Sequence, residues 1–335
     1  MAKLILDADG VLLDERLYWN AALMTALELN GLESIARRDG DRLSAIAFEQ
    51  LGMQRLAKRR GCNSNWDLAA VLTQALGRPA VRNDFISLVS LGRDDEACQR
   101  LVEAADALWL GRTTPISEET PSPQTGDPLL GFGIDRGGRE FAEVRAAFQS
   151  VLRRSTVAGH TPVRWRLREP LPVTQASLRE CDDLGFELWV CTGRDRDEIL
   201  GPLQQFGLES RIPTHRVVCS DDAHAAEVTT GIQPLGKPHW FLPACAAVGF
   251  DQAVAALQGA IPLHGNGILV YAGDALADYE AVLGCTRIGL RIGYIHVRSS
   301  VTTPAEEFAI TASPITLQIV DRLSQVPQVL RRFAP

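Results

Sequence analysis

The sequence lacks an excess of positive charge. Of its 335 residues, 34 are lysine or arginine and 41 are aspartate or glutamate, so the formal net charge is −7. Proteins that hold nucleic-acid backbones need a basic face, and this balance argues against a general nucleic-acid-binding protein. A small phosphorylated ligand remains compatible with it, because a single phosphate group needs only a local site.

Long apolar runs are also missing. No run approaches the roughly 20 apolar residues of a transmembrane helix. The residues after Met1 lead straight into a short strand, without the apolar segment and cleavage site of a secretory signal. We therefore expect a cytoplasmic protein that does not enter a membrane.

The cysteines form no Cys-x-x-Cys pair. The seven of them are dispersed along the chain, at Cys62, Cys98, Cys181, Cys191, Cys219, Cys245 and Cys285. An odd and scattered set is typical of reduced, partly buried thiols in a cytosolic protein and argues against a zinc site.

What is present is enough for a full core and a second domain, with 46% hydrophobic and 22% charged residues. The stretch Thr113–Gly138 is rich in Pro, Gly, Ser and Thr, which predicts a loop. The remainder of residues 15–170 has apolar side chains at three- and four-residue spacing. This spacing predicts helices over Leu17–Leu29, Asp41–Leu51, Trp66–Leu76, Asp95–Leu110 and Arg139–Arg153.

From residue 171 onward, short apolar strands alternate with helices. This alternation predicts a doubly wound α/β fold, in which helices cover both faces of a parallel sheet. The predicted strands are Glu187–Cys191, Arg216–Cys219, Gly267–Ala272, Arg287–Leu290 and a short one at Phe308–Thr311. The predicted helices are Thr174–Leu184, Asp195–Phe206, His239–Ala247, Ala277–Leu283 and Ser324–Phe333.

The first strand, Lys3–Leu6, has no partner in the helical block, so it must join the later sheet. We therefore expect an α/β core made of residues 1–14 and 171–335, with residues 15–170 inserted as a helical domain. Sites in such sheets lie at the carboxyl ends of the strands. We expect the insertion to lie over that edge as a lid.

Asp7, Asp9 and Gly10 follow the first strand directly. Two carboxylates this close repel each other, and neither is stable in the interior without a partner. A bound cation or a reacting phosphoryl group would explain their position at the end of a strand.

Three further motifs follow in order. The segment Thr192-Gly193-Arg194 ends a strand and opens a helix, where a hydroxyl and backbone N–H groups suit an anionic oxygen. Lys237, which precedes a proline, places a positive charge at a helix entrance. Asp274 ends another strand, and Asp278 lies one helical turn further along.

Each motif alone has an ordinary structural explanation. Asp-x-Asp pairs and Thr-Gly steps are common in turns and helix caps, an isolated lysine is usually solvated, and two aspartates can cap a helix. All four motifs together, in this order and at strand ends or helix starts, favour a functional site.

In these motifs the chain resembles the haloacid dehalogenase superfamily, whose members are mostly phosphatases and phosphomutases. The resemblance covers residues 1–14 and 171–335. It implies a three-layer Rossmann-like core with a helical cap inserted after the first strand.

The resemblance also implies roles for these side chains. Asp7 resembles the nucleophile that forms an aspartyl-phosphate, and Asp9 resembles the general acid and base. Thr192 and Gly193 would bind the transferring phosphoryl group. Lys237 would neutralise the phosphoryl charge and hold Asp7 anionic.

Arg194 has two interpretations. It would contact the phosphate together with the preceding Thr-Gly step, or it would pair with Asp195 or Asp197 in the first turn of the helix. The second interpretation is the favoured one, because such first-turn pairs are common.

Mg²⁺ is the implied cofactor. Its ligands would be Asp7, the carbonyl of Asp9 and Asp274, with Asp278 completing or orienting the set. Hard oxygen ligands suit Mg²⁺, and the cation would offset the repulsion between these acids and a phosphate dianion.

We therefore expect a magnesium-dependent phosphomonoester hydrolase that acts on a small phosphorylated metabolite. An aspartate at position 9 favours phosphoryl transfer over carbon–halogen cleavage within the superfamily. A phosphomutase remains an alternative, and so does a less favoured non-catalytic, phosphate-binding regulator on the same scaffold.

Overall fold

The chain divides into two compact units. The computed structural model describes residues 2–59, 65–110, 138–157, 165–259, 263, 265, 267–299 and 302–333. One unit contains residues 1–14 and 166–335, and the other contains residues 15–165. The predicted loop Thr113–Gly138 lies outside the described residues, apart from Gly138.

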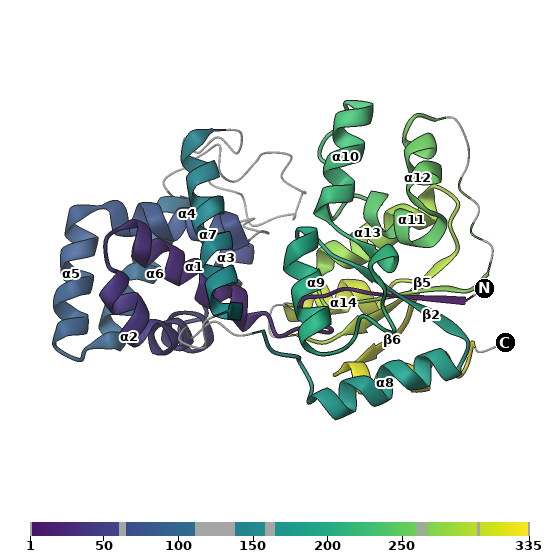
Figure 1. Ribbon diagram of the computed structural model, residues 1–335, viewed down its shortest axis with the longest axis horizontal. Helices are drawn as coiled ribbons and strands as arrows, with labels where there is room; N and C mark the ends of the chain where they lie inside the picture. The colour runs from purple at the N-terminus through teal and green to yellow at the C-terminus, as the bar shows by residue number, and fades with distance from the viewer. Residues whose placement is uncertain are drawn as a thin grey trace. The chain divides into compact units, whose positions relative to one another are not determined.

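A six-stranded parallel sheet forms the centre of the first unit (Figure 1). Its order is β3-β2-β1-β4-β5-β6, with all neighbours parallel. The chain runs outward from β1 in both directions, so the switch point at which such sheets bind ligands lies beside β1. The strands are β1 (Ala2–Leu6), β2 (Phe186–Cys191), β3 (Val217–Val218), β4 (Leu269–Gly273), β5 (Ile292–Val297) and β6 (Thr316–Val320).

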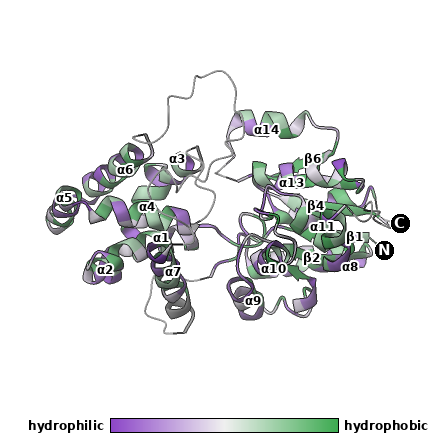
Figure 2. Cartoon of the chain, turned by 90° about the horizontal axis from the view of Figure 1, so that it is seen from above, coloured by the Kyte–Doolittle hydropathy of each residue, from purple (hydrophilic) through white to green (hydrophobic). Residues whose placement is uncertain are grey.

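Apolar side chains on both faces of the strands explain why the sheet is buried. Leu4 and Leu6 belong to the core on one face, Ile5 belongs to the core on the other, and all three are fully buried. A strand covered on both faces has an almost continuous apolar sequence. Figure 2 shows this as green ribbon along β1, β2 and β4.

Helices cover both faces of this sheet, which confirms the doubly wound α/β class. The face that contains Leu4 is packed by α8 (Leu171–Asp183), α9 (Arg196–Gln205) and α15 (Val326–Leu330). The face that contains Ile5 is packed by α10 (Ser220–Thr230), α11 (Phe241–Val248), α12 (Phe250–Leu257), α13 (Leu276–Arg287) and α14 (Pro304–Thr311).

The strand predicted over Arg287–Leu290 is wrong. Helix α13 continues to Arg287, and Gly289 has a φ of +101°, a left-handed conformation that does not occur in a regular strand. The strand instead begins at Ile292, after this turn.

The short strand predicted over Phe308–Thr311 is also wrong, because these residues lie in α14. The helix begins with a capping box: Glu306 N–H donates to the Thr303 hydroxyl (3.3 Å), and Thr303 N–H donates to the Glu306 carboxylate (2.7 Å). This cap, with Pro304 at the helix start, outweighs the strand preference of the residues that follow.

The chain leaves and re-enters the α/β unit through two paired segments. Asp14 N–H donates to the carbonyl of Arg166 (2.9 Å), and Arg168 N–H donates to the carbonyl of Leu12 (3.0 Å). The second unit is therefore inserted shortly after β1.

The second unit is helical, and α1 lies at its centre, packed against α2, α4 and α7. Gly40 permits a close approach between α1 and α2, because a Cβ there would lie 2.2 Å from Met24 Sδ.

The helix predicted over Asp41–Leu51 is instead the end of α2 followed by a π-helical turn. The elements are α1 (Arg16–Leu29), α2 (Glu33–Ser44), the π-helical turn (Ala45–Gln50), α3 (Met53–Arg59), α4 (Asn65–Gly77), α5 (Pro79–Ser90), α6 (Asp94–Leu110) and α7 (Arg139–Val157).

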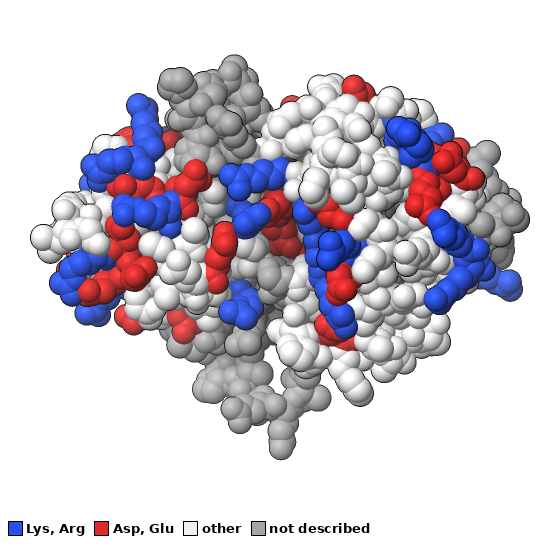
Figure 3. All heavy atoms as spheres, turned by 90° about the horizontal axis from the view of Figure 1, so that it is seen from below, with Lys and Arg blue, Asp and Glu red and all other residues white. Residues whose placement is uncertain are grey.

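Charged side chains of both signs are interspersed over the face shown in Figure 3. Among the described residues, Arg216 pairs with Glu187 at 3.2 Å. Within the described part of the chain, no helix combines the length and the apolar character needed to cross a membrane.

Candidate active site

The first motif lies at the carboxyl end of β1, in the middle of the sheet. Asp7 is 6% exposed, and its N–H donates to the carbonyl of Ala272 on β4 (2.9 Å). Gly10, with a φ of +69°, then turns the chain in a conformation that favours glycine. The two aspartates therefore differ: Asp7 is buried, whereas the Asp9 side chain is 27% exposed.

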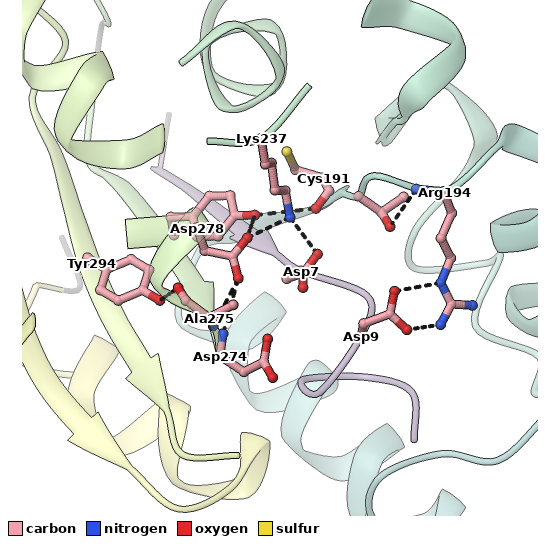
Figure 4. A network of polar contacts seen from close by, with 11 residues as sticks. Asp7, Asp9, Cys191, Arg194, Lys237, Asp274, Ala275, Asp278 and Tyr294 are labelled. Carbon is pink, nitrogen blue, oxygen red and sulfur yellow. Dashed lines mark hydrogen bonds and ion pairs between the residues drawn. The ribbon is translucent and has the colours of Figure 1, made fainter. Parts of the chain in front are cut away.

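Lys237 joins Asp7 to the fourth motif (Figure 4). Its Nζ lies 2.6 Å from Asp7 Oδ1 and 2.7 Å from Asp278 Oδ1. The lysine side chain is 12% exposed and that of Asp278 is 2% exposed. One ammonium is thus shared by two buried carboxylates that come from β1 and α13.

The Asp278 carboxylate accepts from four donors. Its Oδ1 binds Lys237 and the Tyr271 hydroxyl (3.1 Å), and its Oδ2 lies 3.3 Å from the backbone nitrogens of both Asp274 and Ala275. A carboxylate has about four lone-pair sites. Asp278 therefore caps the start of α13 and holds the lysine at the same time.

Asp274 lies beside this pair at the end of β4. It is buried, and its carbonyl accepts a hydrogen bond from the Thr302 hydroxyl (2.6 Å). Carboxylate oxygens of Asp7, Asp274 and Asp278 all lie within 4.8 Å of one another. The chain thus brings three acidic groups together, and two of them, Asp7 and Asp278, bind the same ammonium.

This donor set fits a hard cation. When all three carboxyl groups are ionised, they and the one ammonium leave an excess of two negative charges in a buried site, and buried charge of this kind is normally paired or bound to metal. Carboxylate oxygens are also the ligands that Mg²⁺ and Ca²⁺ prefer. Asp7 and Asp274 could supply them, whereas the oxygens of Asp278 already bind four donors.

Burial and neighbouring charges set the protonation of the site. Burial, reinforced by the Asp278 carboxylate, raises the pKa of Asp7 to about 8, and Lys237 opposes this rise. Burial lowers the pKa of Lys237, but Asp278 and Asp7 outweigh it and raise that pKa well above its ordinary value. Lys237 therefore stays charged. A cation bound beside Asp7 would oppose the rise in the pKa of Asp7, as Lys237 does, and would favour the ionised carboxylate.

Thr192 and Gly193 lie at the carboxyl end of β2, next to β1. Thr192 is fully buried, its N–H donates to the carbonyl of Val218 (2.9 Å), and its hydroxyl oxygen accepts from the Arg194 N–H (3.2 Å). Gly193 is exposed, and apart from its chain neighbours no described atom lies within 4 Å of where a Cβ would be. This leaves the position open to a ligand.

Arg194 binds both carboxylate oxygens of Asp9 through two nitrogens of its guanidinium. Its Nε lies 2.8 Å from Asp9 Oδ2, and its Nη2 contacts Oδ1. The favoured pairing with Asp195 or Asp197 is therefore wrong; Asp195 accepts from the Ser220 hydroxyl instead (2.6 Å). Because β1 and β2 are neighbours, Asp9 lies within reach, and its carboxylate matches the planar guanidinium fork.

Two residues of the site, Tyr271 and Thr302, were not predicted from the sequence. Tyr271 lies within an apolar strand, where its hydroxyl is the only sign of a polar role. Thr302 holds the carbonyl of Asp274 from a loop far along the chain, and no motif marks it.

No family model and no curated protein matches the chain, but solved structures do. A target of a structural genomics consortium aligns with 99% of this chain and 99% of its own, at 17% identity and a TM-score of 0.65. A putative haloacid dehalogenase-like hydrolase from Bacteroides fragilis aligns with 97% of this chain and 100% of its own, at 14% identity and a TM-score of 0.47. A predicted phosphoglycolate phosphatase from Haemophilus somnus aligns with 98% of this chain and 97% of its own, at 12% identity and a TM-score of 0.48.

At these identities the likeness concerns the fold alone. The first strand joins the sheet formed by the later strands, as expected, and the four motifs meet at the carboxyl edge of that sheet. The alignment over nearly the whole length of both chains, at a TM-score of 0.65, shows that this chain shares its fold with the structural genomics target.

Proposed function

We propose that the protein is a Mg²⁺-dependent phosphomonoester hydrolase that acts on a small phosphorylated metabolite through an aspartyl-phosphate. The observation that carries this proposal is a cluster of three buried carboxylates, those of Asp7, Asp274 and Asp278, of which Asp7 and Asp278 bind Lys237. A phosphate dianion would be repelled by this excess of negative charge unless a cation offset it.

Asp7 is the proposed nucleophile. Its carboxylate would attack phosphorus and displace the alcohol, and water would then hydrolyse the aspartyl-phosphate, so that one difficult displacement becomes two easier ones. Lys237, 2.6 Å from Asp7, would stabilise the charge that develops on the phosphoryl oxygens.

Asp9 is the proposed general acid and base. It would give a proton to the leaving oxygen and later take one from the attacking water. Thr192 and the open backbone at Gly193 would bind the phosphoryl oxygens. The Arg194 fork suits phosphate as well as it suits carboxylate, so we propose that it takes part in phosphate binding.

Mg²⁺ would be held by Asp7, Asp274 and the carbonyl of Asp9, and when bound it would neutralise charge on the phosphoryl group. We further propose that the α/β unit is the catalytic core and that the helical unit is a cap that selects the substrate.

A phosphate-release screen tests the proposal. Phosphorylated metabolites would be offered with and without Mg²⁺, and we expect Mg²⁺-dependent release from at least one small ester. Asp7→Asn should lower kcat by about 1000-fold or more, whereas the matched control Asp251→Asn, on the exposed side of α12, should retain full activity. Release from no ester, or full activity of Asp7→Asn, would contradict the proposal; dependence on a bisphosphate activator would identify a mutase.

A further inference from the structure

Tyr271 places a hydroxyl in the buried interior of the sheet. It is fully buried in β4, and its strand neighbours Val270 and Ala272 are apolar. Burying a hydroxyl costs free energy unless it is hydrogen-bonded. A phenylalanine would fill the same space, so the hydroxyl itself needs an explanation.

The hydroxyl lies between two groups of the candidate site. Its oxygen is 3.1 Å from Asp278 Oδ1 and 3.3 Å from the carbonyl oxygen of Cys191. Cys191 ends β2 and directly precedes Thr192, and Asp278 lies in the first turn of α13. A phenol has one proton to donate, and the charged carboxylate at the shorter distance is the stronger acceptor, so the hydroxyl donates to Asp278 and lies next to the element that carries the proposed phosphate contacts.

The oxygen of Asp278 that meets the hydroxyl is the one that binds the lysine. Lys237 Nζ lies 2.7 Å from this Oδ1 and 5.5 Å from the centroid of the Tyr271 ring. A cation close to an aromatic face is attracted by it. Figure 4 shows Asp278 and Asp7 on either side of the ammonium.

The phenol is held in its neutral form. Burial, together with the Asp278 carboxylate, raises the pKa of Tyr271 well above its ordinary value. It therefore remains a hydrogen-bond donor, which is what a carboxylate needs from its neighbour.

We propose that Tyr271 is a positioning residue that holds Asp278, and through Asp278 keeps Lys237 on the proposed nucleophile Asp7. The catalytic part of this inference rests on the proposed function. Without the hydroxyl, Asp278 Oδ1 loses one of its two donors, so the carboxylate and the lysine that it binds gain freedom of movement.

Tyr294 provides a matched control. It is also fully buried, it lies on the neighbouring strand β5, and its ring stacks on that of Tyr271 with centroids 6.2 Å apart. Its hydroxyl donates to the backbone carbonyl of Ala275 (3.3 Å) rather than to Asp278. Tyr271→Phe and Tyr294→Phe each remove one buried hydroxyl, and only the first removes a donor to Asp278.

The chain allows a direct measurement on the lysine, because it contains only three lysines, Lys3, Lys58 and Lys237. Protein labelled with ¹⁵N-lysine would show the ammonium groups by NMR, and a Lys237→Arg variant would assign the signal. We expect hydrogen exchange of the Lys237 ammonium to accelerate roughly fivefold in Tyr271→Phe, the factor typical of one lost hydrogen bond. Tyr294→Phe should leave that rate unchanged, and Lys3, which donates to the carbonyls of Ala246 and Ala247, is the internal reference.

Steady-state kinetics give the second readout. With an ester found in the phosphate-release screen, Tyr271→Phe should lower kcat about 5- to 50-fold and change KM less than about twofold, because the loss concerns the reacting groups. Tyr294→Phe should keep the wild-type kcat, although both variants lose comparable thermal stability.

The two proposals fail in different ways. Equal exchange rates of Lys237 in the wild type and Tyr271→Phe would overturn the positioning role. So would the absence of a Lys237 signal from the wild-type spectrum, because the ammonium would then not be held. If the wild type releases phosphate from no ester, the proposed function fails, and the exchange rates still decide the role of Tyr271.

Discussion

Arg194 and Asp9 form a bidentate ion pair across the ends of β1 and β2, with Arg194 Nε 2.8 Å from Asp9 Oδ2. In this arrangement the side chain of the proposed acid and that of the proposed phosphate ligand bind each other. Both proposed roles require the pair to open. A phosphate offers the guanidinium the same pair of oxygens as the carboxylate, so substrate binding is the event that we expect to release Asp9.

Arg194→Lys tests the importance of this fork. A lysine keeps the positive charge but cannot bind two oxygens in one plane, so kcat/KM should fall by about 10- to 100-fold. The control is Arg211→Lys, which weakens the ion pair with Asp182 and should leave kcat/KM unchanged. Wild-type kinetics in Arg194→Lys would show that the fork has no role in turnover.

The position of the site could be predicted from the sequence because the candidate catalytic and binding side chains directly follow apolar runs. Asp7, Thr192 and Asp274 each follow a buried strand directly, and a parallel sheet brings such ends to one edge. The contact between Arg194 and Asp9 could not be predicted, since it depends on which strands are neighbours. Local sequence instead favoured the nearby aspartates.

The missed strand β5 shows a similar limit. The sequence Arg-Ile-Gly occurs twice, at 287–289 and 291–293, and local preference does not separate the two copies. In the folded chain, a Cβ at Gly293 would lie 2.6 Å from Leu317 Cδ1, so the second glycine packs directly against β6. The first, Gly289, turns the chain instead with a φ of +101°. Only tertiary packing therefore determines which of the two Arg-Ile-Gly copies belongs to a strand.

The metal-free protein should lose stability as the pH rises. The pKa of Asp7 is about 8 in the folded chain and about 4 in an unfolded one, so the folded state binds the proton more tightly. The unfolding free energy should therefore fall between about pH 4 and about pH 8, by up to about 5 kcal/mol from this group.

Urea unfolding in EDTA at several pH values measures this change, and Asp7→Asn should remove most of the difference between low and high pH. It should also be more stable than the wild type at about pH 8, because it no longer places a third negative charge in the cluster. Asp251→Asn, on the surface, should keep the wild-type dependence. Identical pH profiles for the wild type and Asp7→Asn would contradict the raised pKa.

Mg²⁺ should raise the melting temperature of the wild type. At a concentration about 100 times the dissociation constant, binding to the folded state alone adds about 2.7 kcal/mol. Asp274→Asn removes a proposed ligand and should abolish this Mg²⁺-dependent shift, while Asp251→Asn should retain it. An equal shift in Asp274→Asn and the wild type would place the metal elsewhere.

Gly273 and Gly193 should respond differently to the same substitution. A Cβ at Gly273 would lie 2.6 Å from the Cβ of Asp278 and 2.7 Å from its Oδ2, so Gly273→Ala must displace the carboxylate that holds Lys237. We expect a loss of about 1–3 kcal/mol of stability together with a fall in kcat. At Gly193 nothing described lies within 4 Å of the added atom, so Gly193→Ala should change stability by less than about 0.5 kcal/mol.

If Gly193 lines the phosphate site, Gly193→Ala should nevertheless raise KM for a phosphate ester, because the methyl group would occupy space that the phosphoryl oxygens need. Urea unfolding and steady-state kinetics on both variants separate the two effects. Loss of stability in Gly193→Ala would show that the position is packed and not open. If Gly193→Ala changes neither the kinetics nor the stability, the phosphate does not bind at the end of β2.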